Sequence, residues 1–221
     1  GENYTTAETY TITTIDTSAP SLVLDDITKT TAKLTIPYTA TDSQSGISGT
    51  TCEYGTSTNY GKTGTISNNK CIITGLTEGT TYYYKVTTTN GSGIPTEVTG
   101  NTKTGTTGVT FSPTKYPTST EYSQYITVKT TYTADNVSNP IHYFKTTVGT
   151  TSDVSVSECG TEENPGTCSG STKTITANTW YKTTSDPSIK FTSNGTIYAR
   201  INDGENYTTA ETYALTTIDT E

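Results

Sequence analysis

Apolar and polar residues alternate in short runs along most of the chain, a pattern that predicts β-strands rather than helices. The clearest run covers residues 32–38, where every second position is apolar: Ala32, Leu34, Ile36 and Tyr38. A polar segment follows, and two further short runs then place Cys52 beside Tyr54 and Cys71 beside Ile73 on single strand faces. Turn residues separate such runs about every 8 to 12 residues, which is typical of a β-sandwich.

The second half of the chain has the same character with a looser pattern. Its predicted strands cover residues 125–132, 141–144, 180–181, 189–191, 196–201 and 211–218. Asn194-Gly195 stands between two of these runs, and Asn-Gly between apolar runs is a strong short-range signal for a β-hairpin. We therefore expect the strands on either side of Asn194-Gly195 to pair with each other.

The two ends of the chain carry nearly the same sequence. Residues 1–17 read GENYTTAETYTITTIDT, and residues 204–220 differ from them at only two positions, Thr11 against Ala214 and Ile12 against Leu215. The copies are 203 residues apart, a distance that suits two small domains better than one solenoid turn. We expect an all-β chain of two tandem β-sandwiches, residues 18–105 and 106–221, preceded by an extra strand, residues 1–17, that belongs to the end of the preceding repeat.

Composition excludes several classes of function. The chain holds 60 Thr and 17 Tyr, which suit strands, and only 15% of its residues are charged. The net charge of −8 and a single arginine, Arg200, disfavour nucleic-acid binding, which needs clustered Lys and Arg. No apolar run approaches the roughly 20 residues that cross a bilayer, so membrane insertion is not expected.

The four cysteines fall into two close pairs, Cys52 with Cys71 and Cys159 with Cys168. Their spacing lacks the C-x2-C form of a zinc site, and the only histidine, His142, is far from them in the sequence. Two disulfides are the better interpretation, and they indicate an oxidising, extracellular compartment.

Residues 76–86 form the most specific local motif, in which Tyr82 follows Leu76 by six positions and apolar residues then alternate. This motif resembles the corner between strands E and F of fibronectin type III domains. Segment 53–61, with Glu-Tyr-Gly-Thr followed by Tyr-Gly, is similar to the C to C′ turn of bacterial members of that family. The resemblance covers residues 19–104 and implies that the Tyr82 hydroxyl bonds back to the chain.

Residues 194–200, together with the ending Ile218-Asp219, resemble the last hairpin of bacterial immunoglobulin-like repeats on surface proteins. In that family an Ile-Asp-Thr-x-Ala-Pro junction commonly starts the next module, and residues 15–20 of this chain read Ile-Asp-Thr-Ser-Ala-Pro. Proline fixes its own φ and biases the preceding residue toward extended geometry, so the junction should be short and stiff.

No cofactor is expected, with Ca²⁺ left open at the junctions. Asp16 or Asp219 could bind the ion together with Asp42, Asp203 or Asp25, because calcium prefers oxygen ligands. No EF-hand-type loop is present, and Asp203 stands in a segment that reads more simply as a turn.

The sequence does not favour an enzyme. It lacks the usual nucleophile, metal-protease and nucleotide-binding motifs, and His142 is most simply a strand residue. The carboxylate pairs Asp25-Asp26 and Glu162-Glu163 are adjacent in sequence, so on a strand their members would point to opposite faces.

The function that these observations favour is structural: an extender or stalk repeat of a large bacterial surface or secreted protein, with neighbouring repeats as its partners. An adhesin module that binds a glycan or a host protein is one alternative, and an accessory module of a secreted polysaccharide-degrading enzyme is another. Self-association by exchange of strand 1–16 is a further hypothesis. The acidic loop between Cys159 and Cys168, with Glu162-Glu163-Asn164-Pro165, is more simply a solubilising tip than a recognition loop.

Reduction of the two predicted disulfides is expected to lower the melting temperature by several degrees. Each closed loop of about 10 to 20 residues stabilises the folded chain by about 3 kcal/mol on the loop-entropy model. Thermal unfolding with and without a reducing agent measures this, and coincident curves would contradict the pairing.

Overall fold

The computed structural model describes residues 5–10, 15–118 and 122–219. These residues form eighteen β-strands and no helix, which confirms the all-β prediction. Consequently, no helix in the described part of the chain could cross a membrane. The backbone divides into two compact units. One holds Ile36–Ile72 and Tyr83–Asn101 with the segment before Ile27, and the other holds Ile27–Thr35, Ile73–Tyr82 and the chain from Thr102 onward.

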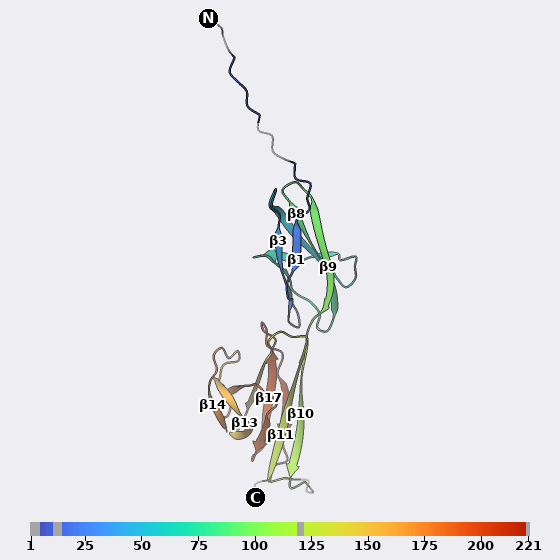
Figure 1. Ribbon diagram of the computed structural model, residues 1–221. Helices are drawn as coiled ribbons and strands as arrows, with labels where there is room; N and C mark the ends of the chain where they lie inside the picture. The colour runs from blue at the N-terminus through green and yellow to red at the C-terminus, as the bar shows by residue number, and fades with distance from the viewer. Residues whose placement is uncertain (1–4, 11–14, 119–121, 220–221) are drawn as a thin grey trace. The chain divides into compact units, whose positions relative to one another are not determined.

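Two antiparallel sheets are built from the strands between Ser21 and Lys103 (Figure 1). The five-stranded sheet has the order β1-β3-β7-β6, with β2 paired to β3. Its strands are β1 (Ser21–Leu24), β2 (Thr28–Lys29), β3 (Leu34–Thr41), β6 (Thr65–Ser67) and β7 (Lys70–Ile73). The four-stranded sheet has the order β5-β4-β8-β9, and its strands are β4 (Ile47–Gly55), β5 (Lys62–Thr63), β8 (Thr81–Asn90) and β9 (Pro95–Lys103).

A disulfide between Cys52 of β4 and Cys71 of β7 joins the two sheets through their shared core. Both cysteines are fully buried, as are Ile36 and Val86. The alternation in the sequence therefore placed the inward residues correctly, and the first predicted disulfide is confirmed.

The strands from Thr106 onward form one nine-stranded sheet in the order β10-β11-β16-β13-β15-β12-β17-β18, with β14 paired to β13. The strands are β10 (Thr106–Tyr116), β11 (Tyr125–Asp135), β12 (Ile141–Thr146), β13 (Thr150–Gly160), β14 (Ser169–Ile175), β15 (Trp180–Thr183), β16 (Ser188–Phe191), β17 (Gly195–Asn202) and β18 (Glu211–Leu215). Strands β10 and β18 stand at the two ends of this order, yet the ring centroids of Phe111 in β10 and Tyr213 in β18 are 6.0 Å apart. The sheet therefore folds over on itself. The folded sheet encloses a core that includes Val128, Phe144, Tyr181, Ile189, Phe191, Ile197 and Ile201.

The hairpin predicted at Asn194-Gly195 is wrong. Strand β16 pairs with β11 and β13, whereas β17 pairs with β12 and β18. The Asn-Gly segment therefore connects two strands that are not neighbours. Local turn chemistry indicated that the chain turns here, but the partner of each strand is set by the packing of distant segments.

The two copies of the repeated sequence differ in conformation. In the second copy, β18 pairs with β17. In the first copy, residues 5–10 and 15–17 have no regular secondary structure (Figure 1), and residues 1–4 and 11–14 lie outside the described residues. The strand expected over residues 1–17 is thus not found in its described part. The physical reason is that a strand needs a partner, and the described residues offer this copy no equivalent of β17.

The same tyrosine corner occurs twice in the chain, once at the start of β8 and once at the start of β15. The amide of Thr77 donates a hydrogen bond of 3.0 Å to the Tyr82 hydroxyl, and the amide of Thr176 donates one of 2.9 Å to the Tyr181 hydroxyl. Each corner also contains a residue in the left-handed region three positions after its buried aliphatic residue, Gly79 or Asn178. The second corner was not predicted, although Ile175 and Tyr181 repeat the six-residue spacing of the first. It fixes the position of strand β15, which begins at Trp180.

Removing either corner hydroxyl is expected to destabilise the protein. The substitutions Tyr82→Phe and Tyr181→Phe should each lower the free energy of unfolding by about 1 kcal/mol, because a threonine amide loses its acceptor. Tyr83→Phe is the matched control and should change it by less than about 0.5 kcal/mol. Urea unfolding measures all three, and equal values for Tyr82→Phe and Tyr83→Phe would contradict the role of the corner.

Candidate functional site

The face of β12, β15 and β17 that points away from the main core carries a second, smaller cluster of side chains. Side chains alternate between the two faces of a strand, so Ile197, Ala199 and Ile201 enter the core while Tyr198 and Arg200 point outward. The register then sets their neighbours across the sheet, with Tyr143 opposite Arg200 and Lys145 opposite Tyr198. On β15 the buried ring of Trp180 belongs to the same outer cluster as Tyr143.

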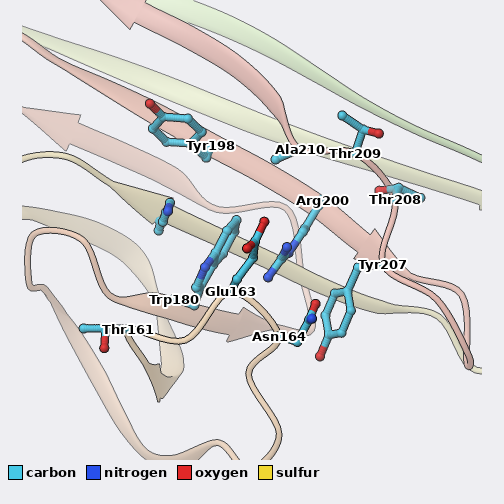
Figure 2. A pocket seen from close by; sticks show the side chains of 11 residues that line it. Thr161, Glu163, Asn164, Trp180, Tyr198, Arg200, Tyr207, Thr208, Thr209 and Ala210 are labelled. Atoms are coloured by element: carbon cyan, nitrogen blue, oxygen red, sulfur yellow. The ribbon is translucent and has the colours of Figure 1, made fainter.

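The centre of this face is a stack of two aromatic rings around a guanidinium group. The guanidinium carbon of Arg200 lies 4.0 Å from the ring centroid of Trp180 and 4.5 Å from that of Tyr207. Figure 2 shows Arg200 between the two rings. Tyr207 comes from the connection between β17 and β18, and it also tilts against Tyr143 at 5.5 Å. Cation–π contacts of this kind are worth about 0.5–2 kcal/mol.

A second cation lies on the same face. The Lys145 ammonium is 5.0 Å from the ring centroid of Trp180 and 5.1 Å from that of Tyr198. Trp180 is therefore approached by two positive charges, Lys145 and Arg200. This pair of cations stands out in a chain whose net charge is −8.

A cavity of about 660 Å³ opens over this face. Its opposite wall is the loop between β13 and β14, which contributes the exposed side chains of Glu163 and Asn164 (Figure 2). A disulfide between Cys159 and Cys168 closes the base of this loop and confirms the second predicted pair. The Tyr207 hydroxyl donates a hydrogen bond of 2.7 Å to the carbonyl oxygen of Pro165, so the loop is tied to the aromatic stack as well.

Two residues that line the cavity hold buried donor atoms without an acceptor in the part of the chain that the structure describes. Arg200 is only 5% exposed and Trp180 only 2%, yet the Nε and Nη2 atoms of Arg200 and the Nε1 atom of Trp180 have no hydrogen-bond partner among the described residues. Burial lowers the pKa of the Arg200 guanidinium, while Tyr207 and Glu163 act in the opposite direction. Arginine nevertheless stays charged in proteins. Buried donors without acceptors are costly, so this face is suited to receiving an acceptor from a ligand.

A different polar cluster anchors the junction segment to the first unit. The Asp16 carboxylate is buried and accepts hydrogen bonds from the Asn90 amide at 2.7 Å, the Ser45 hydroxyl at 2.6 Å and the Ser18 backbone at 2.9 Å. The same Asn90 amide group donates to the carbonyl oxygen of Ser18 at 2.9 Å and to Asp42 at 3.3 Å. The Ile-Asp-Thr junction is therefore held against its sandwich by side chains.

The five calcium candidates are divided between the two units. Asp16, Asp25 and Asp42 belong to the first unit, where Asp16 and Asp42 share the Asn90 amide, whereas Asp203 and Asp219 belong to the second. The described residues contain no group of three or more His, Cys, Asp or Glu side chains that could hold a metal. Hydrogen bonds from the backbone of Ser45, followed by the Asn90 amide and other backbone groups, lower the pKa of Asp42 against the opposing effect of burial. Donors of the protein itself therefore bond the Asp42 carboxylate, one of the oxygen groups that the calcium hypothesis uses.

His142 lies in β12 and stacks on the ring of Tyr132 with centroids 4.5 Å apart. Burial lowers the pKa of its imidazole, with Asp186 acting in the opposite direction. The structure places this histidine in a packing contact, next to the tyrosine whose hydroxyl donates to the Tyr143 carbonyl oxygen.

Sequence reasoning did not find the cavity. It treated the loop from Cys159 to Cys168 as a solubilising tip, and the structure makes Glu163 and Asn164 of that loop part of the cavity wall. The available signal was the outward face of the predicted strand 196–201, where Tyr198 and Arg200 alternate with apolar residues. Their convergence with Trp180 depends on the pairing of β12 with β15 and β17.

Comparisons with known proteins leave the family open. No protein-family model matches the sequence, and no curated protein matches it. Chitinase ChiA74 from Bacillus thuringiensis is a similar solved structure, with a TM-score of 0.33 and 14% identity over 91% of this chain, which spans 30% of the chitinase. Another belongs to a study of promiscuous carbohydrate-binding modules of the β-sandwich superfamily, with a TM-score of 0.34, 11% identity and coverage of 90% of this chain and 96% of that one. Similarities of this size carry no inference about function.

The junction cluster makes a prediction about stability. Asp16→Ala is expected to lower the free energy of unfolding by about 1–3 kcal/mol, because the buried amide of Asn90 loses its closest acceptor. Asp26→Ala removes an exposed aspartate of the same unit and should change the stability by less than about 0.5 kcal/mol.

Urea unfolding gives the stabilities, and hydrogen exchange at the Ser18 amide shows whether the junction has been released. Protection of that amide should fall in Asp16→Ala and stay unchanged in Asp26→Ala. Unchanged exchange in both variants would show that the cluster does not hold the junction.

Proposed function

We propose that this chain is a structural extender repeat, two tandem β-sandwiches divided near residue 105, in a large extracellular protein of the bacterial surface. The first sandwich is of the fibronectin type III kind and the second of the immunoglobulin-like kind. The sheet order β5-β4-β8-β9 supports the first assignment, because it matches the C′-C-F-G order of such sandwiches. Two disulfides support a location in an oxidising compartment.

One observation carries the proposal: the repeated junction sequence is anchored in two different ways in its two copies. In the second copy, Ile218 is buried in the core that ends the repeat and pairs with Ser123. In the first copy, Asp16 is buried against the sandwich that follows it. Ile218 and Asp219 correspond to Ile15 and Asp16 in the repeated sequence. At each junction of an array, the isoleucine would therefore belong to the module before it and the aspartate to the module after it. A tandem array would then have no free linker residue between repeats.

The exposed apolar residues of the first copy support the same arrangement. Ile15 is 85% exposed, whereas its counterpart Ile218 is 7% exposed. Tyr10 is 88% exposed, whereas its counterpart Tyr213 packs on Phe111. The burial of Ile218 and the partial burial of Tyr213 in the second copy support the end of the preceding repeat as the surface that would cover their counterparts.

A junction without slack has a mechanical consequence that can be measured. In a polypeptide of two repeats that share one copy of residues 204–220, small-angle X-ray scattering should give a maximum dimension close to twice that of one repeat. Insertion of three glycines between the Ile218 and Asp219 positions should shorten the mean dimension and broaden its distribution, because Gly-rich linkers behave as flexible coils.

The same insertion after Gly100 of β9 lies inside a strand and serves as a control for general destabilisation. Identical scattering from the direct and the glycine-containing junctions would contradict the extender function. A compact two-repeat particle without the insertion would contradict it as well.

A further inference from the structure

We infer that the cavity over β12, β15 and β17 is a binding site for a saccharide that carries a carboxylate, with Arg200 as the group that recognises the charge. The inference does not depend on the extender function, because it concerns a site within one unit of one chain. It rests on three features of the cavity: two cations, three aromatic rings, and donors that have no acceptor in the described residues.

The donors of Arg200 have the geometry of a carboxylate receptor. Nε and Nη2 lie on the same edge of the guanidinium group, and both lack a hydrogen-bond partner among the described residues. Two parallel donors on a planar group match the two oxygens of a carboxylate, and such bidentate pairs are the strong, directional form of this interaction. Lys145, on the same face, adds a second positive charge.

The aromatic rings supply the surface for the sugar. Trp180 and Tyr207 enclose the guanidinium, while Tyr198 lines the cavity beside Lys145. An aromatic ring presents an apolar face with a polar tip at its edge, and this combination suits a sugar ring, which has C–H groups on its faces and hydroxyls at its rim. The volume of about 660 Å³ is in the range of small-molecule sites.

The carboxylate of Glu163 would compete with an anionic ligand for the Arg200 guanidinium. It lines the cavity, and its charge acts on Arg200, yet the described residues show no ion pair between the two. Since Nε and Nη2 of Arg200 are buried, a ligand reaches them only when the side chains that cover them move aside. Removing the charge of Glu163 should therefore strengthen binding of an anion.

The duplication extends the inference to an array. Tyr207, Thr208, Thr209 and Ala210 all line the cavity, and the sequence Tyr-Thr-Thr-Ala occurs unchanged at residues 4–7 of the first copy. If the preceding repeat uses its copy in the same way, each repeat carries one such site. An acidic polysaccharide could then engage several sites at once, and the gain from linked binding can exceed the affinity of one site by orders of magnitude.

The test uses the single tryptophan of the chain as the reporter. Trp180 is the only tryptophan and lies in the cavity wall, so a change in its fluorescence reports on this site. Titration with glucuronate at constant ionic strength should give a saturable change with a dissociation constant of about 1 mM, as expected for a ligand of this size. Glucose and acetate, which supply the ring or the carboxylate alone, should bind at least about tenfold more weakly.

Two variants give opposite expectations. Arg200→Lys keeps the charge but loses the paired donors, and it should weaken glucuronate binding at least about tenfold. Glu163→Gln should strengthen binding by about two- to fivefold, because a competing exposed charge is removed. Glu162→Gln is the matched control, since Glu162 is its sequence neighbour with the same charge but does not line the cavity.

Because Glu163 is exposed, its substitution leaves the fold intact even if Arg200→Lys does not. The inference is overturned if glucose or acetate matches glucuronate, or if Glu163→Gln and Glu162→Gln change the affinity equally. It is also overturned if Trp180 fluorescence shows no saturable response to glucuronate at concentrations well above the expected dissociation constant. None of these results would bear on the scattering of the two-repeat polypeptide, so the two proposals can fail separately.

Discussion

The structure of the second unit depends on the register between β12 and β17. Side chains on a strand alternate between faces, so a register that puts Phe144 and Ala199 in the core must put Tyr143 and Arg200 together on the other face. A slip by one residue would bury the Arg200 guanidinium in the core and expose Ile201. The apolar core thereby fixes the polar face that forms one wall of the cavity.

The first unit depends on side-chain hydrogen bonds and on a disulfide. Its junction is held by the carboxylate of Asp16 and the amide of Asn90, and its two sheets are joined by the disulfide between Cys52 and Cys71. A chain with 29% hydrophobic residues has little apolar surface to bury, so covalent and polar contacts provide a larger part of its stability. This explains why polar residues such as Thr88 and Asn90 occupy fully buried positions.

Much of the fold could be predicted because its signals are local. Alternation identified the inward faces of β3, β4 and β7, and the cysteine spacing identified both disulfides. Signals that depend on distant pairing failed. Asn194-Gly195 marked a turn but not its partners, and the repeated terminal sequence formed a strand only where a partner strand was present. The candidate cavity was missed for the same reason, since Trp180, Arg200 and Tyr207 meet only through the order of strands in the sheet.

The disulfide of the first sandwich also limits how far the chain can lengthen under load. Cys52 and Cys71 are 19 positions apart in sequence, while their Cα atoms are 6.0 Å apart. If a pulling force opened this sandwich from its ends, the bridged loop would stay closed and withhold about 60 Å of extended backbone. If the extender proposal holds, each such sandwich would lengthen under load by less than its residue count implies, and it would refold from a less extended state.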